Sequence, residues 1–278
     1  MRYLLGWFFV LFSMVSWAAA EDTTVASPSP SPSPVSTPEA PAAEVKPATW
    51  FSVHVDGPYI AMTFDDGPSA ETTPRLLDIL KQRNLKVTFF EIGQNAERNP
   101  AIVKRILAEG HEIGNHSWTH PQLSKLSDER VTEEITKTQD AIKNASGSGY
   151  TPTLLRPPYG AITARQKEWI EKQFGLSIIM WSVDPFDWKR PGESVIEQRI
   201  LAGARPGAII LSHDIHKQTV DAMPATLDAL IAKGFKFVTV SQLIAMNTPK
   251  SSATPSSRPS ASPHASPVKK KARLAAGN

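Results

Sequence analysis

Short apolar runs alternate with amphipathic stretches between about residues 50 and 245 of the chain. The apolar runs are rich in β-branched and aromatic residues, which is typical of buried strands. The stretches between them place their apolar residues on one face of a helix. The predicted strands cover residues 59–62, 87–93, 112–114, 154–156, 177–181, 208–211 and 237–240. The predicted helices cover residues 74–81, 101–108, 127–144, 164–174, 194–202 and 220–233.

Strands that alternate with helices in this way indicate parallel βα units in a barrel or a wound sheet. Ligands of such folds collect at the carboxyl ends of the strands. In this chain polar residues follow the predicted strands at just those ends. They are Asp65 and Asp66, residues 116–120, residues 156–159, residues 184–187, and His213.

The two ends of the chain differ from its middle. Residues 1–20 carry Arg2, an apolar body and three alanines before the first acids, which predicts a secretory signal peptide cleaved after Ala20. An uncleaved membrane anchor is the alternative. Residues 21–48 are a Ser/Pro-rich linker and residues 247–278 a Ser/Pro-rich basic tail, both expected to be disordered. A single folded domain is therefore expected at residues 49–246.

The positive charge of the chain belongs to its tail. The whole chain carries +3, and residues 247–278 hold six Lys and Arg and no acid, so the remainder carries −3. An exported protein seldom meets nucleic acid, so the tail favours contact with an anionic cell-wall polymer or membrane surface, or no partner at all. Cysteine is absent, which excludes disulfides and thiolate metal sites.

Asp65 and Asp66 stand where an apolar strand meets Gly67 and Pro68, and alone they fit ordinary turn chemistry. His116 and His120 are four residues apart, so a helix or a tight loop would turn both rings to one point. Two histidines and a carboxylate form the ligand set of hydrolytic zinc sites, and also of non-haem iron oxygenases. Ligand type alone does not choose between them.

Five motifs together resemble the polysaccharide deacetylases, the family with a NodB homology domain known as carbohydrate esterase family 4. The resemblance covers residues 59–244 and is closest to bacterial peptidoglycan N-acetylglucosamine deacetylases. It implies a distorted (β/α)7 barrel in a single catalytic domain. The motifs, in the order of the family, occupy residues 63–67, 116–120, 156–160, 184–188 and 211–213.

The resemblance also implies a role for each matching residue. Asp65 corresponds to the general base and Arg156 to the residue that pairs with it. His213 corresponds to the general acid, which Asp187 orients. The backbone N–H of Tyr159 corresponds to a donor to the oxyanion.

The metal and substrate contacts follow from the same motifs. Asp66, His116 and His120 correspond to the ligands of a divalent cation, with Zn²⁺ expected and Co²⁺, Ni²⁺ or Mn²⁺ as alternatives. The residues that correspond to substrate contacts are Pro157, Tyr159, Trp188 and Leu211.

The sequence therefore predicts an exported, monomeric, metal-dependent hydrolase that removes N-acetyl groups from N-acetylglucosamine residues of a cell-wall polysaccharide and releases acetate. Peptidoglycan is the expected polymer, and the location is secreted, periplasmic or bound to the wall. A chitin or chitooligosaccharide deacetylase is a closely related alternative. A wall-binding protein without catalysis and an iron oxygenase are alternatives of other classes.

Overall fold

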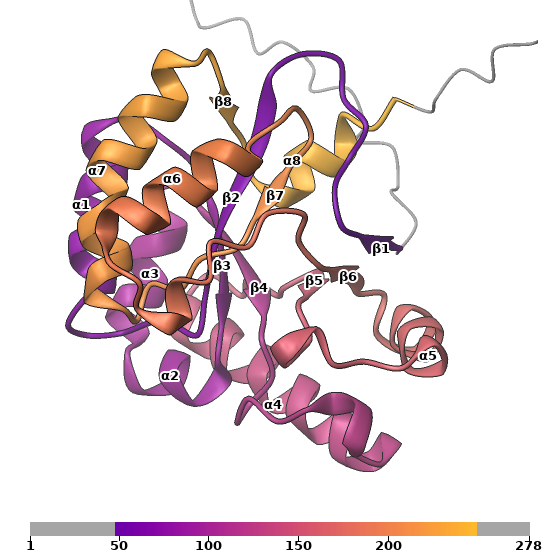
Figure 1. Ribbon diagram of the computed structural model, residues 1–278. Coiled ribbons are helices and arrows are strands. Elements are labelled where there is room, and N and C mark those ends of the chain that lie inside the picture. The colour runs from indigo at the N-terminus through magenta and orange to yellow at the C-terminus, as the bar shows by residue number, and fades with distance from the viewer. Residues whose placement is uncertain (1–47, 249–278) are drawn as a thin grey trace, which may run out of the picture. The chain divides into compact units, whose positions relative to one another are not determined.

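The computed structural model describes residues 48–248, in which strands and helices alternate (Figure 1). The strands are β1 (Thr49–Trp50), β2 (Tyr59–Asp65), β3 (Thr88–Glu91), β4 (Glu112–Asn115), β5 (Leu154–Leu155), β6 (Ser177–Ile179), β7 (Ile209–Ile210) and β8 (Lys236–Phe237). The α-helices are α1 (Thr73–Gln82), α2 (Gly93–Arg98), α3 (Pro100–Ala108), α4 (Asp128–Ser146), α5 (Ala164–Phe174), α6 (Glu193–Gly203), α7 (Lys217–Ala232) and α8 (Val240–Ala245). The short 3₁₀ turns are η1 (Leu123–Lys125), η2 (Pro158–Gly160) and η3 (Asp187–Lys189).

The strands form one parallel sheet in the order β1-β6-β5-β4-β3-β2-β7, and β8 pairs with the first residues of β2. The chain just after β6 then pairs with β7 and closes the ring. There Ser182 N–H donates to Ile209 O at 3.0 Å, and Leu211 N–H donates to Val183 O at 2.9 Å. The expected distorted (β/α)7 barrel is thus confirmed, and all seven predicted strands are present.

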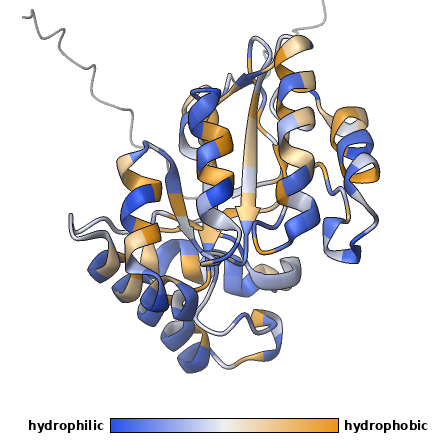
Figure 2. Ribbon diagram, turned by 90° about the vertical axis from the view of Figure 1, so that its left-hand side faces the viewer, coloured by the Kyte–Doolittle hydropathy of each residue, from blue (hydrophilic) through white to orange (hydrophobic). Residues whose placement is uncertain are grey.

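β2 pairs with three strands, β3, β7 and β8, and both of its faces are buried from Ile60 onward. Helices cover the outside of a parallel sheet, so apolar residues fill both faces of such a strand. Phe64 stacks on Phe89 of β3 at 5.6 Å between ring centroids, whereas Phe90 belongs to a second apolar cluster with Ala61. In Figure 2 the helices carry hydrophilic residues outward. Truncating Phe64 to Ala would cost about 3–5 kcal/mol of stability.

The ends of the two helices α4 and α5 follow from local sequence. Ser127 caps α4 by accepting from Arg130 N, and Gly147 ends that helix in the left-handed conformation. Thr163 and Gln166 form a capping box at the start of α5, which Gly175 ends in the same way. The predicted starts of these helices at residues 127 and 164 are confirmed to within one residue.

Three predicted strands, at 87–93, 177–181 and 237–240, run at least two residues too far, and the second of them stops at Ile179. The strand predicted at 87–93 stops at Glu91, and α2 begins at Gly93, where a Cβ would meet the Trp118 side chain at 2.4 Å. The strand predicted at 237–240 stops at Phe237, because Thr239 forms a capping box with Gln242 and starts α8. At residues 239–242 the capping box outweighs the strand propensity of the β-branched run, whereas no side-chain cap marks the start of α2.

The predicted signal peptide, linker and basic tail lie outside the described residues, apart from positions 247 and 248 and the last residue of the linker. The domain boundaries at 49 and 246 therefore stay predictions. Within residues 48–248, no helix combines the length and the apolar character that crossing a membrane requires.

Candidate active site

The end of β2 places two carboxylates on one site. Asp65 is the last residue of the strand, and its N–H donates to Ser212 O at 2.9 Å. The chain turns at Asp66, whose φ of 74° lies in the left-handed region that Asp and Asn tolerate better than most residues. Gly67 follows, and a Cβ there would lie 2.5 Å from the Asp214 carboxylate. The sequence predicted the turn at Gly67 and Pro68, and the structure shows that it begins one residue earlier.

The histidine pair occupies a tight loop after β4, one of the two conformations that the spacing allowed. Ser117 and His120 have φ values of 65° and 61°, so the loop is not helical. Ser117 Oγ accepts from His120 N–H at 3.0 Å. The Glu134 carboxylate of α4 accepts from the N–H groups of Trp118 and Thr119, both at 2.8 Å. These bonds fix the loop that carries both imidazoles.

Asp66, His116 and His120 converge as a metal-binding set. Asp66 Oδ1 lies 3.4 Å from His116 Nε2 and 3.2 Å from His120 Nε2. Three such ligand atoms lie within 4.8 Å of one another. His116 Nδ1 bonds to Arg156 O at 2.7 Å, which fixes the ring and turns Nε2 toward the site. Asp66 Oδ1 is buried without a hydrogen-bond partner in the described chain, so the residues present fit a divalent cation.

The protonation of these groups also fits cation binding. Burial opposes the ionisation of Asp66, but the adjacent His116 ring, with the charges of His120 and His213, holds the pKa of Asp66 below its ordinary value. Burial, helped by the charge of His116, lowers the pKa of His120. An ionised carboxylate and a neutral imidazole are the forms that bind metal.

Arg156 is a buried cation beside Asp65. Its side chain is fully buried, and its Nη1 donates to Asp65 Oδ1 at 2.6 Å and to Thr63 Oγ1 at 2.7 Å. The guanidinium also lies 4.1 Å from the centroid of the Phe90 ring. The other oxygen, Asp65 Oδ2, lies 3.7 Å from His116 Nε2. Arg156 thus holds one oxygen of Asp65 and leaves the other at the site.

His213 and Asp187 form a second pair across the site. His213 Nδ1 bonds to Asp187 Oδ1 at 2.8 Å, and His213 N–H donates to Asp187 Oδ2 at 2.7 Å. Asp187 is fully buried and also accepts from Thr219 Oγ1 at 2.8 Å. Burial disfavours the charged ring, but the hydrogen bond and charge of Asp187, with the charges of Asp65 and Asp66, outweigh it and raise the pKa of His213 to about 9. The ring is therefore protonated at neutral pH.

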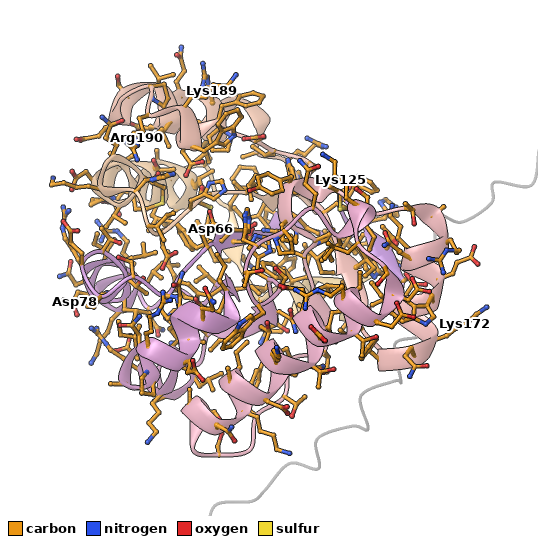
Figure 3. The ribbon with its side chains drawn as sticks, turned by 90° about the horizontal axis from the view of Figure 1, so that it is seen from below. Asp66, Asp78, Lys125, Lys172, Lys189 and Arg190 are labelled. Carbon is orange, nitrogen blue, oxygen red and sulfur yellow. The ribbon has the colours of Figure 1, made fainter. Side chains whose placement is uncertain are left out.

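A cavity of about 420 Å³ joins these groups. Arg156 and Asp187 are buried behind it, and every other predicted site residue lines it. Tyr159 lies on the 3₁₀ turn η2 with a φ of 59°, and its ring packs on His120 at 4.5 Å between centroids. In the view from below, Asp66 lies near the middle of the domain, between the sides that carry Asp78 and Lys125 (Figure 3). The predicted lining residues are Asp65, Asp66, His116, His120, Pro157, Tyr159, Trp188, Leu211 and His213.

The sequence did not assign two residues that line the cavity, Trp181 and Asp184. Trp181 was placed as the last residue of the strand predicted at 177–181, but β6 ends at Ile179, so Trp181 in fact follows the strand as the other site residues do. Asp184 Oδ1 accepts a hydrogen bond from Phe186 N–H at 2.7 Å, and burial raises the pKa of the Asp184 carboxyl. Glu134 and Thr219 support the site from helices that are distant in sequence from the residues they bond, and no local pattern marks them.

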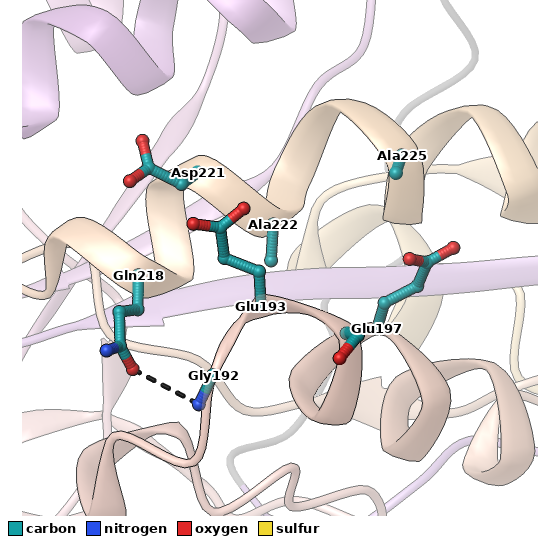
Figure 4. Close-up of a pocket in the computed structure, with 8 residues that line it drawn as sticks. Gly192, Glu193, Glu197, Gln218, Asp221, Ala222 and Ala225 are labelled. Atoms are coloured by element: carbon teal, nitrogen blue, oxygen red, sulfur yellow. Dashed lines mark hydrogen bonds between the residues drawn. The ribbon is translucent and has the colours of Figure 1, made fainter.

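A second hollow of about 440 Å³ lies between α6 and α7 (Figure 4). Glu193, Glu197 and Asp221 line it, and Gln218 accepts from Gly192 N–H at 3.2 Å. Asp221 is already paired with cations on α1 and α7. An acidic hollow of this kind lacks the converging acid, base and ligand groups of the first cavity.

Comparison with known proteins identifies the family. A family model described as polysaccharide deacetylase matches residues 52–179. A peptidoglycan-N-acetylglucosamine deacetylase of Bacillus cereus is 42% identical over 208 residues, which cover 71% of this chain and 74% of that protein. The chain belongs to the polysaccharide deacetylase family. The resemblance seen in the five motifs is thereby confirmed.

Other members of the polysaccharide deacetylase family agree in fold and differ in length. The peptidoglycan-N-acetylglucosamine deacetylase PgdA of Listeria monocytogenes is 48% identical over 184 residues. That match covers 66% of this chain but 38% of the Listeria protein, so the chain spans well under half of that relative's length. The solved structure of the Bc1960 peptidoglycan N-acetylglucosamine deacetylase superposes with a TM-score of 0.68 at 40% identity, covering 72% of this chain and 94% of that chain.

Proposed function

We propose that this protein is a metal-dependent hydrolase that removes N-acetyl groups from N-acetylglucosamine residues of peptidoglycan and releases acetate. One observation carries the proposal. A single cavity holds an Asp-His-His ligand set, a carboxylate held by a buried arginine, and an imidazole held by a buried aspartate. Amide hydrolysis needs an activated water, a base and an acid, and each has a residue in this arrangement.

Asp65 is the general base of the proposed reaction. Arg156 occupies Oδ1, so Oδ2 faces the cavity and takes the proton of the attacking water. Arg156 also keeps the carboxylate in one orientation, because its own side chain is locked by Thr63 and by the carbonyl oxygens of Ile179 and Met180. A base fixed in this way is in place before the substrate arrives.

His213 is the general acid. The amine of the sugar is a poor leaving group, so it needs a proton as the C–N bond breaks. The raised pKa of His213 keeps that proton on the ring, and the bond to Asp187 leaves Nε2 as the donor. The N–H of Tyr159 has no hydrogen-bond partner within residues 48–248 and is the donor to the oxyanion that forms on the acetyl carbonyl.

Asp66, His116 and His120 would hold the divalent cation, with His116 oriented by the Arg156 carbonyl. When bound, such a cation acts as a Lewis acid and lowers the pKa of water toward neutrality. The nitrogen-rich ligand set favours Zn²⁺, and Co²⁺, Ni²⁺ or Mn²⁺ would also fit it.

Peptidoglycan is the proposed substrate because two relatives that match this chain over most of their own length are named peptidoglycan-N-acetylglucosamine deacetylases. Pro157, Trp188 and Leu211 line the cavity and would contact the sugar and its acetyl group. A wall substrate agrees with the predicted export signal, and the basic tail would then contact anionic wall polymer or the membrane surface.

The test is acetate release by the purified mature protein. Peptidoglycan sacculi and acetylated chitooligosaccharides are each incubated with enzyme, with enzyme and chelator, and with chelated enzyme resupplied with Zn²⁺. We expect release that the chelator stops and the metal restores, with peptidoglycan as the better substrate. Release from chitooligosaccharides alone would show that the substrate is a chitin-type polymer and not peptidoglycan. Metal-independent release, or none from either polymer, would overturn it.

A further inference from the structure

An aromatic and cationic wall stands beside the active site. It is formed by Phe186, Trp188 and Lys189 on and next to the turn η3, and Trp188 lines the cavity. The two rings lie 6.2 Å apart and are 41% and 49% exposed, which is unusual for large apolar side chains. Lys189 Nζ lies 5.0 Å from the Phe186 ring centroid and 4.8 Å from that of Trp188. The ammonium is thus held against both rings by cation–π attraction.

The wall is fixed relative to the catalytic acid. Asp187 Oδ1 accepts from both Trp188 N–H and His213 Nδ1, so one carboxylate joins the wall to the acid. Lys189 N–H donates to Phe186 O at 3.1 Å, and Phe186 itself adopts a left-handed backbone. The backbone of Lys189 is therefore anchored beside the catalytic acid, and its ammonium lies against the two rings.

The cations of the wall form no ion pair within the described part of the chain. Among the residues that the structure describes, neither Lys189 nor Arg190 has an acidic side chain within ion-pairing distance. Arg199 adds a third cation, with its guanidinium 5.6 Å from the Phe186 ring. Seen from below, Lys189 and Arg190 project on the same side of Asp66 (Figure 3). Asp184 also lines the cavity and feels the charge of Lys189, so three cations stand beside one acid here, although residues 1–246 together are acidic.

We propose that this wall is a subsite for a carboxylate-bearing sugar, with Lys189 as the group that binds the carboxylate. The inference rests on the proposed deacetylase function and names what the same site selects. Exposed aromatic rings stack on the apolar faces of sugars, and an ammonium beside them binds an anionic substituent. Glycan strands of peptidoglycan carry a lactyl group on alternate sugars, and its carboxylate is free wherever the stem peptide has been removed, whereas chitin is neutral. The wall thus distinguishes peptide-free glycan strands from chitin, although both carry the same scissile N-acetyl group.

The experiment compares two forms of one polymer. Peptidoglycan glycan strands freed of their peptides present lactyl carboxylates, and carbodiimide coupling with ammonia converts these to neutral amides. The kcat/KM for acetate release is measured on both forms with the wild type, Lys189→Gln and Lys189→Arg. We expect Lys189→Gln to lower the preference for the carboxylate form by about five- to tenfold, through KM, as the loss of a partly exposed charged contact predicts. Lys189→Arg retains the preference, because it retains the charge.

Lys172→Gln is the matched control. Lys172 is an exposed lysine on α5 that projects far from Asp66 (Figure 3), so its loss changes the net charge without changing the wall. Added salt should reduce the wild-type preference and have little effect on that of Lys189→Gln. An unchanged preference in Lys189→Gln, or an equal loss in Lys172→Gln, would overturn the subsite alone. Failure of the wild type to release acetate from either form would overturn the proposed function and the subsite with it.

Discussion

Replacing Asp187 with Asn removes the negative charge behind His213 and keeps a side chain of the same shape. In the wild type the His213 side chain is 13% exposed, and its Nδ1 lies 2.8 Å from Asp187 Oδ1. Burial alone would lower the pKa of His213, and the bond and charge of Asp187 are the largest effects that oppose it. The substitution should therefore return the ring to its neutral form near neutral pH.

The size of the effect follows from the pKa. The rise from 6.5 to about 9 in the pKa of His213 stabilises the protonated ring by roughly 3 kcal/mol, at about 1.36 kcal/mol per pH unit. If the pKa returns to about 6.5, the protonated fraction at pH 8 falls from about 90% to about 3%. Because the acid must be protonated to act, kcat/KM should fall by about 30-fold at pH 8 and much less at pH 6.

The assay is the pH profile of kcat/KM for acetate release, with bound metal measured on the same samples. We expect the alkaline limb to move from near pH 9 in the wild type toward pH 6.5 in Asp187→Asn, with metal content unchanged. Asp228→Asn is the control, because Asp228 is an exposed acid that pairs with Arg83 and does not line the cavity. An alkaline limb that stays in place, or a metal content that drops, would refute the role given to Asp187.

Three further predictions concern single substitutions. Asp65→Asn should lower kcat by at least about 100-fold while the metal content stays at the wild-type level, because Asp65 is proposed as the base and not as a ligand. Retained turnover would contradict this. His116→Ala should lose the metal, as elemental analysis after dialysis would show, since two ligands remain. Glu91→Gln should raise the melting temperature more at pH 8 than at pH 5. Glu91 is fully buried with both oxygens unpartnered in the described chain, and burial, with the charge of Asp214, raises its pKa well above 4.5. Between about pH 4.5 and the raised pKa of the folded state, Glu91 ionises only in the unfolded protein, so the stability of the wild type falls as pH rises through this range. An equal change in melting temperature at both pH values would contradict this argument.

The sequence was enough to place the strands and the polar groups at their ends. Parallel strands are buried on both sides, so their apolar runs are visible without a structure, and the end of each run marks the rim where a site forms. Asp65, His116 and His213 were found in this way. Their convergence in one cavity follows from the topology, because adjacent parallel strands end at the same edge.

The supporting groups could not be predicted from the sequence. Glu134 holds the histidine loop from the middle of α4, and Thr219 supports Asp187 from α7. Both contacts join elements that are distant in the chain, and a buried polar residue on a helix has no local signature of its partner. The position of Lys189 over two rings is a similar case. It depends on the left-handed backbone at Phe186, and a phenylalanine does not predict that conformation.

The left-handed backbone at Asp66 limits which residues can replace it without disturbing the turn. A φ of 74° is tolerated by Asp, Asn and Gly and strains most other residues. Asn keeps the turn but carries no negative charge, and its codons differ from those of Asp at one base. A single nucleotide change at this position would therefore keep the turn and remove the negative charge from the proposed ligand set.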